Sequence, residues 1–253
     1  MLSYNTGVLL SCGVDITNKR RMKKLMERGA APLWVFNTNE LKDIAQNEDL
    51  LCGYFTFKEA FLKAFGSSWL GGPVGADEIE VSITRPALTG QSASFRFFGR
   101  ASEAFLKCGY SSVKMIFSES NGNVTTGVIM SNQHGARIIR SAGVARVCPD
   151  ARVVSFFDNK QNAPSGEHGG EIFLRRQAVE AAGRAAAYRA VAGLLRKGSW
   201  KTTREEHAIE IVTDRAGRPV IANPCSFRRI AAPVLSISYT KDYAVCLAAA
   251  FAC

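Results

Sequence analysis

The stretch FTFKEAFLKAFG, residues 55–66, decides the fold of the first half of this 253-residue chain. Its apolar residues recur at every third or fourth position, which is the spacing of a helix with one buried face. Gly66 is a natural C-terminal stop, and the only charged residues are Lys58, Glu59 and Lys63. The stretch therefore predicts a largely buried helix that carries three charges.

Two segments upstream have clear patterns. Residues 7–16, GVLLSCGVDI, form an apolar run with glycines, which predicts a buried strand ending at Gly13. Residues 17–28, TNKRRMKKLMER, predict a basic amphipathic helix with Thr17 as its N-cap. Asp15 comes between them as a lone acid, and a buried carboxylate is costly unless a cation or a hydrogen-bond donor meets it.

The rest of the chain is expected to form two further helices and several short strands. A capped helix is expected from Thr38 to about Cys52, and an alanine-rich helix from Glu171 to about Lys197. Turn residues at 120–123 separate two strands. The remaining expected strands cover residues 79–83, 94–98, 113–117, 124–130, 208–213, 234–238 and 244–251.

An internal repeat relates the two halves. The segment VKMIFSESNGNVTTGVIM from Val113 aligns without a gap on VLSISYTKDYAVCLAAAF from Val234, and the helix at Gly53 aligns on the helix at Gly183. We therefore expect an α+β fold of two similar halves, each a long helix packed on a small antiparallel sheet. The expected domains are residues 1–131 and 171–253, with a linker at 132–170 that is rich in Gly, Ser, Pro, Asn and Gln. A chance similarity of two α+β halves is the alternative.

The net charge of +10 is concentrated in the second half, since residues 1–131 carry a net +2 and residues 132–253 a net +8. Such a basic field attracts anionic partners, either nucleic acid, an acidic protein surface or a phosphate-rich small molecule. The alternative is charge that serves only solubility.

Other features bear on the compartment. The seven cysteines are odd in number and scattered, which predicts reduced thiols in a cytoplasmic protein. No secretory signal and no apolar run long enough for a membrane span are expected. We assign no role to the three isolated histidines, His134, His168 and His207.

Two groups of residues could carry chemistry. Glu59 and Lys63 lie four positions apart and share one helical face, either as a routine surface ion pair or, with Asp15, as a site for Mg²⁺ and a pyrophosphate. The second group is SISYTKDYA, residues 236–244, whose hydroxyl groups suit either a phosphate or an ordinary hairpin turn.

Three short motifs resemble the signature motifs of the 4'-phosphopantetheinyl transferases of the holo-acyl-carrier-protein synthase type. They are Gly13-Val-Asp-Ile16, Phe57-Lys-Glu-Ala-Phe-Leu-Lys-Ala64 and Ser236-Ile-Ser-Tyr-Thr240. The resemblance covers the first 66 residues and the last 20 well, and the middle only by pattern. It implies transfer of 4'-phosphopantetheine from CoA to a serine of an apo carrier protein, with Mg²⁺ as cofactor and release of 3',5'-ADP.

The resemblance also implies an architecture. Larger family members fuse two copies into a pseudo-dimer with one site, so a monomer with an internal pseudo-dimer is expected. The first copy would supply Asp15, Glu59 and Lys63. In the second copy the KEA triplet would be replaced by Tyr188-Arg189-Ala190, while the third motif is kept.

Each site residue then has an implied role. Asp15 and Glu59 would hold Mg²⁺, Glu59 or a metal-ordered water would accept the serine proton, and Lys63 would neutralise phosphoryl charge. The resemblance further implies that the CoA nucleotide is bound by Arg184, Ser236, Ser238, Tyr239 and Thr240. Arg21, Lys24 and Arg28 recur on one helical face, which implies a dock for an acidic carrier protein or, alternatively, a solvated basic face.

Tyr239 departs from the family pattern, which usually has histidine at this position. Tyrosine donates one hydrogen bond and carries no positive charge near neutral pH. This difference leaves open a repurposed, non-catalytic relative that binds CoA or a carrier protein. A basic nucleic-acid-binding module is a further alternative, although the aromatic residues do not alternate with basic ones as stacking platforms require.

Overall fold

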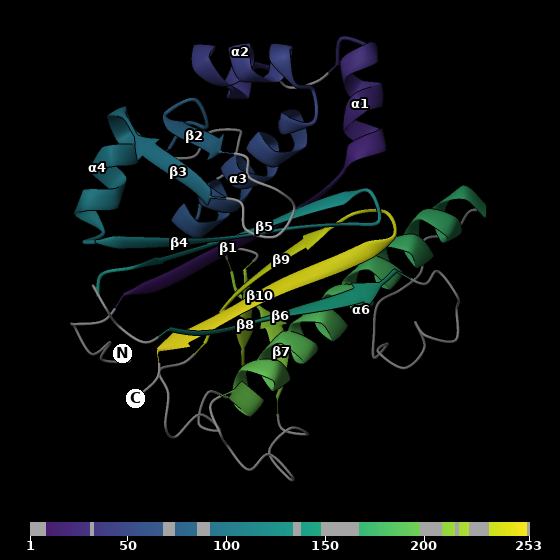
Figure 1. Ribbon diagram of the computed structural model, residues 1–253. Helices are drawn as coiled ribbons and strands as arrows, with labels where there is room; N and C mark the ends of the chain where they lie inside the picture. The colour runs from purple at the N-terminus through teal and green to yellow at the C-terminus, as the bar shows by residue number, and fades with distance from the viewer. Residues whose placement is uncertain are drawn as a thin grey trace. The chain divides into compact units, whose positions relative to one another are not determined.

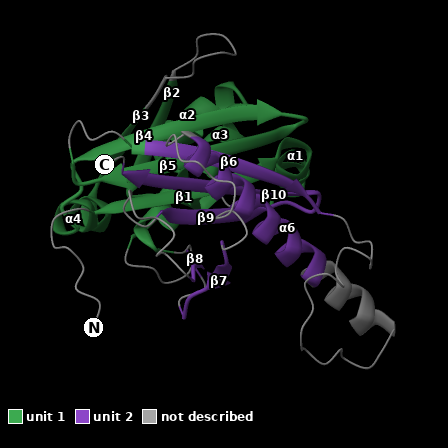
Figure 2. Ribbon diagram, turned by 90° about the horizontal axis from the view of Figure 1, so that it is seen from below, with its two compact units in different colours: residues 1–138, 252 green, residues 139–251, 253 purple. Residues whose placement is uncertain are grey.

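The computed structural model divides into two compact units, with the division between Ile138 and Ile139 (Figure 2). It describes residues 9–30, 33–67, 74–84, 92–133, 138–147, 167–197, 209–215, 218–222 and 233–251. Within these ranges no helix is both long and apolar enough to cross a membrane.

The first unit holds a three-stranded antiparallel sheet in the order β1-β5-β4 and a separate hairpin of β2 and β3 (Figure 1). Its elements are β1 (Leu10–Asn18), α1 (Lys19–Glu27), the short 3-10 helix η1 (Leu33–Val35), α2 (Thr38–Gln46), α3 (Leu50–Phe65), β2 (Ile79–Thr84), β3 (Ser92–Phe97), α4 (Gly99–Lys107), β4 (Ser112–Ser120) and β5 (Asn123–Ser131). Asn121 and Gly122 both have positive φ and make the tight turn between β4 and β5, where the sequence predicts one.

Helix α3 is the centre of the first unit because most of its residues are buried. Phe57 and Phe61 belong to its hydrophobic core, and Gly66 ends the helix in the left-handed conformation. The helix lies very close to β1 at Gly13, where an added Cβ would be 1.8 Å from the carbonyl oxygen of Ala60. Glycine is thus the residue that lets the helix backbone reach the sheet.

The second unit holds a sheet in the order β6-β10-β9, and the long helix α6 packs on it. Its elements are β6 (Ile138–Arg146), α6 (Glu167–Lys197), β7 (Ile211–Thr213), β8 (Pro219–Ile221), β9 (Val234–Tyr239) and β10 (Tyr243–Phe251). Small side chains dominate this core, including Ala186 and Ala190 of α6. Gly143 repeats the close approach of Gly13, since its added Cβ would be 2.0 Å from the carbonyl oxygen of Ala186.

Each unit therefore has the predicted α+β form, a long helix on an antiparallel sheet, and this expectation is confirmed. The strands β4 and β9 hold the same place in their sheets, each beside the central strand. The segments from Val113 and Val234 are thus topologically equivalent, as the repeat requires. How the two units pair in a pseudo-dimer stays a prediction.

The helix alignment in the repeat is wrong by one turn. Gly13 lies against Ala60 and Ala64, and Gly143 lies against Ala186 and Ala190, so Ala186 corresponds to Ala60. The counterpart of Lys58-Glu59-Ala60 is therefore Arg184-Ala185-Ala186 and not Tyr188-Arg189-Ala190. An alanine-rich helix presents similar residues on every turn, so an alignment by sequence can slip by four positions.

Several boundaries also differ from the expectations. Strand β1 continues past Gly13 to Asn18 because it pairs with β5 along its whole length, and Asn18 rather than Thr17 caps α1. The helix expected from Thr38 ends at Gln46, capped by Asn37, and α3 starts at Leu50. Helix α4 was not predicted at all, since it is short and begins at a glycine.

The expected linker at residues 132–170 is also corrected in part. Residues 138–146 form β6, which pairs in the sheet of the second unit, and α6 begins at Glu167. The glycine-containing strand β6 lacks the long apolar run that marks a buried strand, because its exposed and buried residues alternate. His134 and His207 lie outside the described residues.

Candidate active site

Asp15 is a buried carboxylate on β1, only 6% exposed, and it pairs across the sheet with Thr126. Its Oδ1 lies 2.9 Å from Nζ of Lys63, and its Oδ2 accepts a hydrogen bond of 3.1 Å from the hydroxyl of Thr17. Lys63 also donates to the carbonyl oxygen of Val14, at 3.2 Å. A cation and a donor therefore compensate the burial of Asp15, as the sequence requires.

Glu59 lies one turn before Lys63 on α3 and shares its face. Burial and, to a smaller extent, the negative charge of Asp15 raise the pKa of Glu59, and with the opposing effect of the Lys63 ammonium the pKa is about 7. A carboxyl group of this pKa can exchange a proton near neutral pH. Lys63 is thus more than a surface partner of Glu59, because it donates to the buried carboxylate of Asp15 on β1.

The donor set of Asp15 and Glu59 suits a hard divalent cation. The negative charge of Asp15 disfavours the ionised form of Glu59, and a bound cation would relieve that repulsion. Mg²⁺ uses one or two protein carboxylates and completes its shell with water and phosphate oxygens. In the described part of the chain no cluster of three or more His, Cys, Asp or Glu side chains could hold a metal. The residues therefore fit Mg²⁺ only as a two-carboxylate site.

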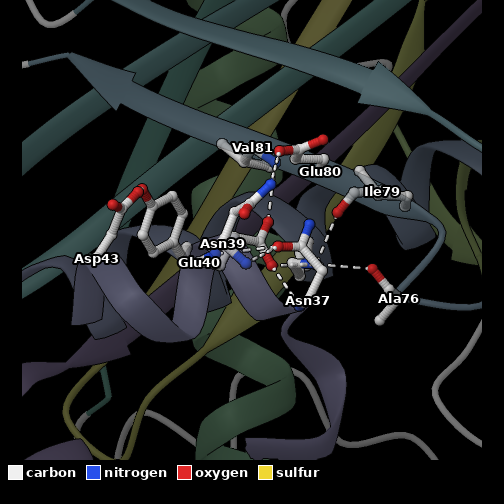
Figure 3. Close-up of polar contacts among 10 residues, drawn as sticks. Asn37, Asn39, Glu40, Asp43, Ala76, Ile79, Glu80 and Val81 are labelled. Atoms are coloured by element: carbon white, nitrogen blue, oxygen red, sulfur yellow. Dashed lines mark hydrogen bonds and ion pairs between the residues drawn. The ribbon is translucent and has the colours of Figure 1, made fainter. Parts of the chain in front are cut away.

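A second charged group on α3 was missed by sequence reasoning. Lys58 is fully buried, and its Nζ lies 2.7 Å from Oε2 of Glu40 on α2. It also donates to the carbonyl oxygens of Ala76, at 2.8 Å, and Ile79, at 2.6 Å. Figure 3 shows Glu40 among its neighbours Asn37, Ile79 and Val81. Burial lowers the pKa of Lys58 and raises that of Glu40, while each charge opposes the shift of the other. Nζ thus has three oxygen neighbours, which matches the three protons of an ammonium.

The signal for Glu40 was present in the sequence. Asn37-Thr-Asn-Glu40 is a capping box, in which the Asn37 side chain accepts from the backbone of Glu40 and Glu40 accepts from the backbone N–H of Asn37. The box identifies Glu40 as a residue of the first helical turn. It does not identify Lys58 as its partner.

The predicted CoA-binding residues of β9 lie on opposite faces of this strand. Tyr239 is 41% exposed, and its ring lies against α6 at Gly183, where an added Cβ would be 2.3 Å from the hydroxyl oxygen. Burial raises the pKa of Tyr239, and the charge of the nearby Arg184 opposes this. Ser236 and Ser238 are buried, and they alternate along β9 with Leu235 and Ile237, which belong to the hydrophobic core between α6 and the sheet. The two serines therefore face away from Tyr239 and Arg184.

Thr240 has a local structural role. Its hydroxyl accepts from the backbone N–H of Tyr243, at 3.0 Å, and of Asp242, at 3.3 Å. These bonds shape the turn between β9 and β10.

The second unit keeps a cation where the first has Lys63, but it keeps neither carboxylate. Arg189 donates to the carbonyl oxygen of Val144, just as Lys63 donates to that of Val14. With the corrected alignment, Ala145 takes the place of Asp15 and Ala185 that of Glu59. The second unit alone therefore has no equivalent metal site.

The predicted docking face on α1 is exposed. Arg21 and Lys24 are exposed on the helix, and Arg28 is exposed at its C-cap, while Met22 is buried beneath them. The face is basic, because the helix contains one acidic residue, Glu27.

Comparison with known proteins finds a family match within the first unit. Residues 11–109 match the sequence model of the 4'-phosphopantetheinyl transferase superfamily. The match contains Asp15, Glu59 and Lys63, and it confirms the resemblance of the first two motifs, while the third motif at residues 236–240 lies outside it. No curated protein matches the chain at a significant level.

Solved structures of holo-acyl-carrier-protein synthases are similar to about half of the chain. The Plasmodium yoelii enzyme is 18% identical, with 51% of this chain and all of that one covered and a TM-score of 0.41. The Neisseria meningitidis enzyme is 26% identical, with 47% and 96% covered and a TM-score of 0.40. The Helicobacter pylori enzyme, solved with coenzyme A, is 18% identical, with 47% and 98% covered and a TM-score of 0.38.

Proposed function

We propose that this chain transfers the 4'-phosphopantetheine group of CoA to a serine of an apo acyl or peptidyl carrier protein. The observation that carries the proposal is the meeting of Asp15, Glu59 and Lys63 within the segment that matches the superfamily. Two carboxylates beside a lysine provide a cation site, a proton acceptor and a positive charge for a pyrophosphate.

In the proposed step, the serine oxygen bonds to the β-phosphorus of CoA, and the bond from that phosphorus to the bridging oxygen breaks. The electron pair of the broken bond leaves with 3',5'-ADP. Glu59, ionised above pH 7, accepts the serine proton directly or through a water. Lys63, held by Asp15, neutralises charge on the phosphoryl oxygens.

Asp15 and Glu59 would hold Mg²⁺. When bound, the ion supplies Lewis-acid stabilisation of the pyrophosphate oxygens. Lys63 and Thr17 fix the orientation of the Asp15 carboxylate, since each bonds one of its oxygens.

We further propose roles for the basic residues. Arg21, Lys24 and Arg28 would attract an acidic carrier protein. Arg184, Tyr239, Ser236, Ser238 and Thr240 would contribute to binding CoA, with Thr240 acting through the turn that it shapes.

Mass spectrometry tests the proposal directly. The protein is incubated with an apo acyl carrier protein, CoA and Mg²⁺, and the carrier is examined for one added phosphopantetheine. We expect this adduct, and its loss when EDTA is added. A protein that modifies no apo carrier yet still binds CoA would instead support the repurposed relative, for which Tyr239 is the main argument.

Metal affinity should depend on pH. A proton on Glu59 competes with the cation, so the affinity for Mn²⁺, used as a probe for Mg²⁺, should fall by about tenfold per pH unit below pH 7. Isothermal titration at pH 5.5, 6.5 and 7.5 measures it. The dependence should disappear in Glu59→Gln and persist in Glu103→Gln, which changes an exposed residue of α4. An affinity that stays constant in the wild type would contradict the role of Glu59.

Tyr239→His should strengthen CoA binding. A histidine can form a charge-assisted hydrogen bond to a phosphate, worth about 1.5–3 kcal/mol against roughly half of that for a neutral one. We expect KM for CoA to fall by up to about tenfold with kcat little changed, because such a contact binds the ground and transition states alike. Steady-state kinetics measures both constants. Tyr188→His, on the exposed side of α6, is the matched control, and an equal effect there would contradict a specific contact.

A further inference from the structure

The Glu40–Lys58 ion pair takes no part in the proposed chemistry, yet it joins several elements of the first unit (Figure 3). Oε1 of Glu40 accepts from the backbone N–H of Val81 on β2, at 2.9 Å, and Oε2 accepts from that of Asn37 before α2, also at 2.9 Å. Lys58 adds α3 and the carbonyl oxygens of Ala76 and Ile79. The pair is therefore the polar junction of α2, α3 and β2.

Lys58 directly precedes Glu59, so the junction and the site lie on neighbouring faces of one helix. Successive residues of an α-helix are 100° apart. Viewed down α3 from Lys58, Glu59 and Lys63 follow at about 100° and 140°, and Ala60 and Ala64 at about 200° and 240°. The alanines touch Gly13 of β1. Glu59 and Lys63 thus lie, around the helix, between the alanine contact with Gly13 on one side and the Glu40–Lys58 ion pair on the other.

We propose that Glu40 and Lys58 are positioning residues, which fix the rotation of α3 so that Glu59 and Lys63 are held toward Asp15. This inference rests on the proposed function. A rotation of about 10° moves a side chain about 5–6 Å from the helix axis by about 1 Å. Metal ligands tolerate errors of only about 0.5 Å. Changes to such supporting groups typically lower metal affinity by about 10–100-fold.

Two variants separate positioning from stability. Lys58→Met leaves the Glu40 carboxylate buried without its cation and should lower the melting temperature strongly. Adding Glu40→Gln removes the second charge, and we expect the melting temperature to recover in part, because the amide keeps one oxygen for the backbone N–H groups of Asn37 and Val81. We expect the affinity for Mn²⁺, measured by isothermal titration without CoA, to stay at least about tenfold below wild type in the double variant.

Tyr54→Phe is the matched control. The Tyr54 hydroxyl donates to Asp43 at 2.7 Å, so this bond also joins α3 to α2, and its loss leaves the ion pair intact. We expect some loss of melting temperature and an Mn²⁺ affinity within about twofold of wild type. An equal loss of affinity in Tyr54→Phe would overturn the proposal, because any loosening of α2 would then suffice.

The remaining outcomes are also decisive. A double variant that regains both stability and wild-type Mn²⁺ affinity would overturn the positioning role. If the double variant does not fold, Glu40→Gln alone replaces it, since the amide oxygen still accepts from Lys58, and we expect a loss of about threefold. Unchanged affinity there would again contradict the proposal. A wild-type protein that binds no Mn²⁺ would instead remove the proposed metal site itself, and with it this inference.

Discussion

Glu59→Gln is expected to abolish phosphopantetheine transfer and to make the protein more stable. Glutamine keeps the shape of the side chain but offers neither a proton acceptor nor an anionic metal ligand. We expect a loss of at least about 10²–10³-fold, in the range that proton transfer contributes. The measurement is the rate of adduct formation on an apo carrier protein by mass spectrometry.

The gain in stability follows from the sign of the pKa shift. The folded protein holds the Glu59 proton more tightly than the unfolded chain, since its pKa is about 7 instead of 4.5. The stabilisation from this group is therefore full below pH 4.5 and is lost as the pH rises through 7. At pH 8 the ionised side chain destabilises the fold by on the order of 1–3 kcal/mol, and glutamine removes this penalty.

The control for this experiment is Glu103→Gln, which removes a glutamate from the exposed side of α4. It should leave both activity and stability close to wild type. A Glu59→Gln protein that transfers at the wild-type rate would show that Glu59 has no part in the reaction. A strong loss of stability at pH 8 would show that its ionised form is held by partners and not opposed by burial.

The sequence could predict that Asp15 needs a partner and that Glu59 and Lys63 share a helical face, because these signals are local. Glu59 and Lys63 are four positions apart on one helix, and Asp15 follows an apolar strand, where burial demands a partner. The structure supplies that partner as Lys63. Helical spacing and the cost of a buried charge therefore indicate these residues as candidates, and the resemblance of the motifs implies their roles.

The ion pair of Glu40 and Lys58 could not be predicted, because the two residues are on different helices and no local sequence pattern indicates that they meet. The charge of Lys58 predicts an exposed side chain, whereas in the structure this side chain is completely buried. The same limit explains the slip of one turn in the repeat. An alanine-rich helix carries no side chain that fixes its register, and only the contact between Gly143 and Ala186 does so.

Gly13→Ala is the prediction with the largest expected effect on stability. The added Cβ would lie 1.8 Å from the carbonyl oxygen of Ala60 and 2.8 Å from the backbone nitrogen of Ala64. Both are backbone atoms of α3 and cannot rotate away. The helix must therefore move off the sheet, which opens the packing of Phe57 and Phe61. We expect a loss of at least about 3 kcal/mol in the free energy of unfolding.

Urea unfolding of Gly13→Ala beside Gly53→Ala tests this expectation. Gly53 is on the same helix, but an added Cβ there first meets Cδ1 of Ile83 at 2.8 Å, the flexible end of a side chain. Alanine also favours the helix by about 1 kcal/mol over glycine, so Gly53→Ala should be nearly neutral. A Gly13→Ala protein with the unfolding midpoint of wild type would show that α3 does not lie this close to β1, and Glu59 and Lys63 would then lose the contact that holds their helix on the strand of Asp15.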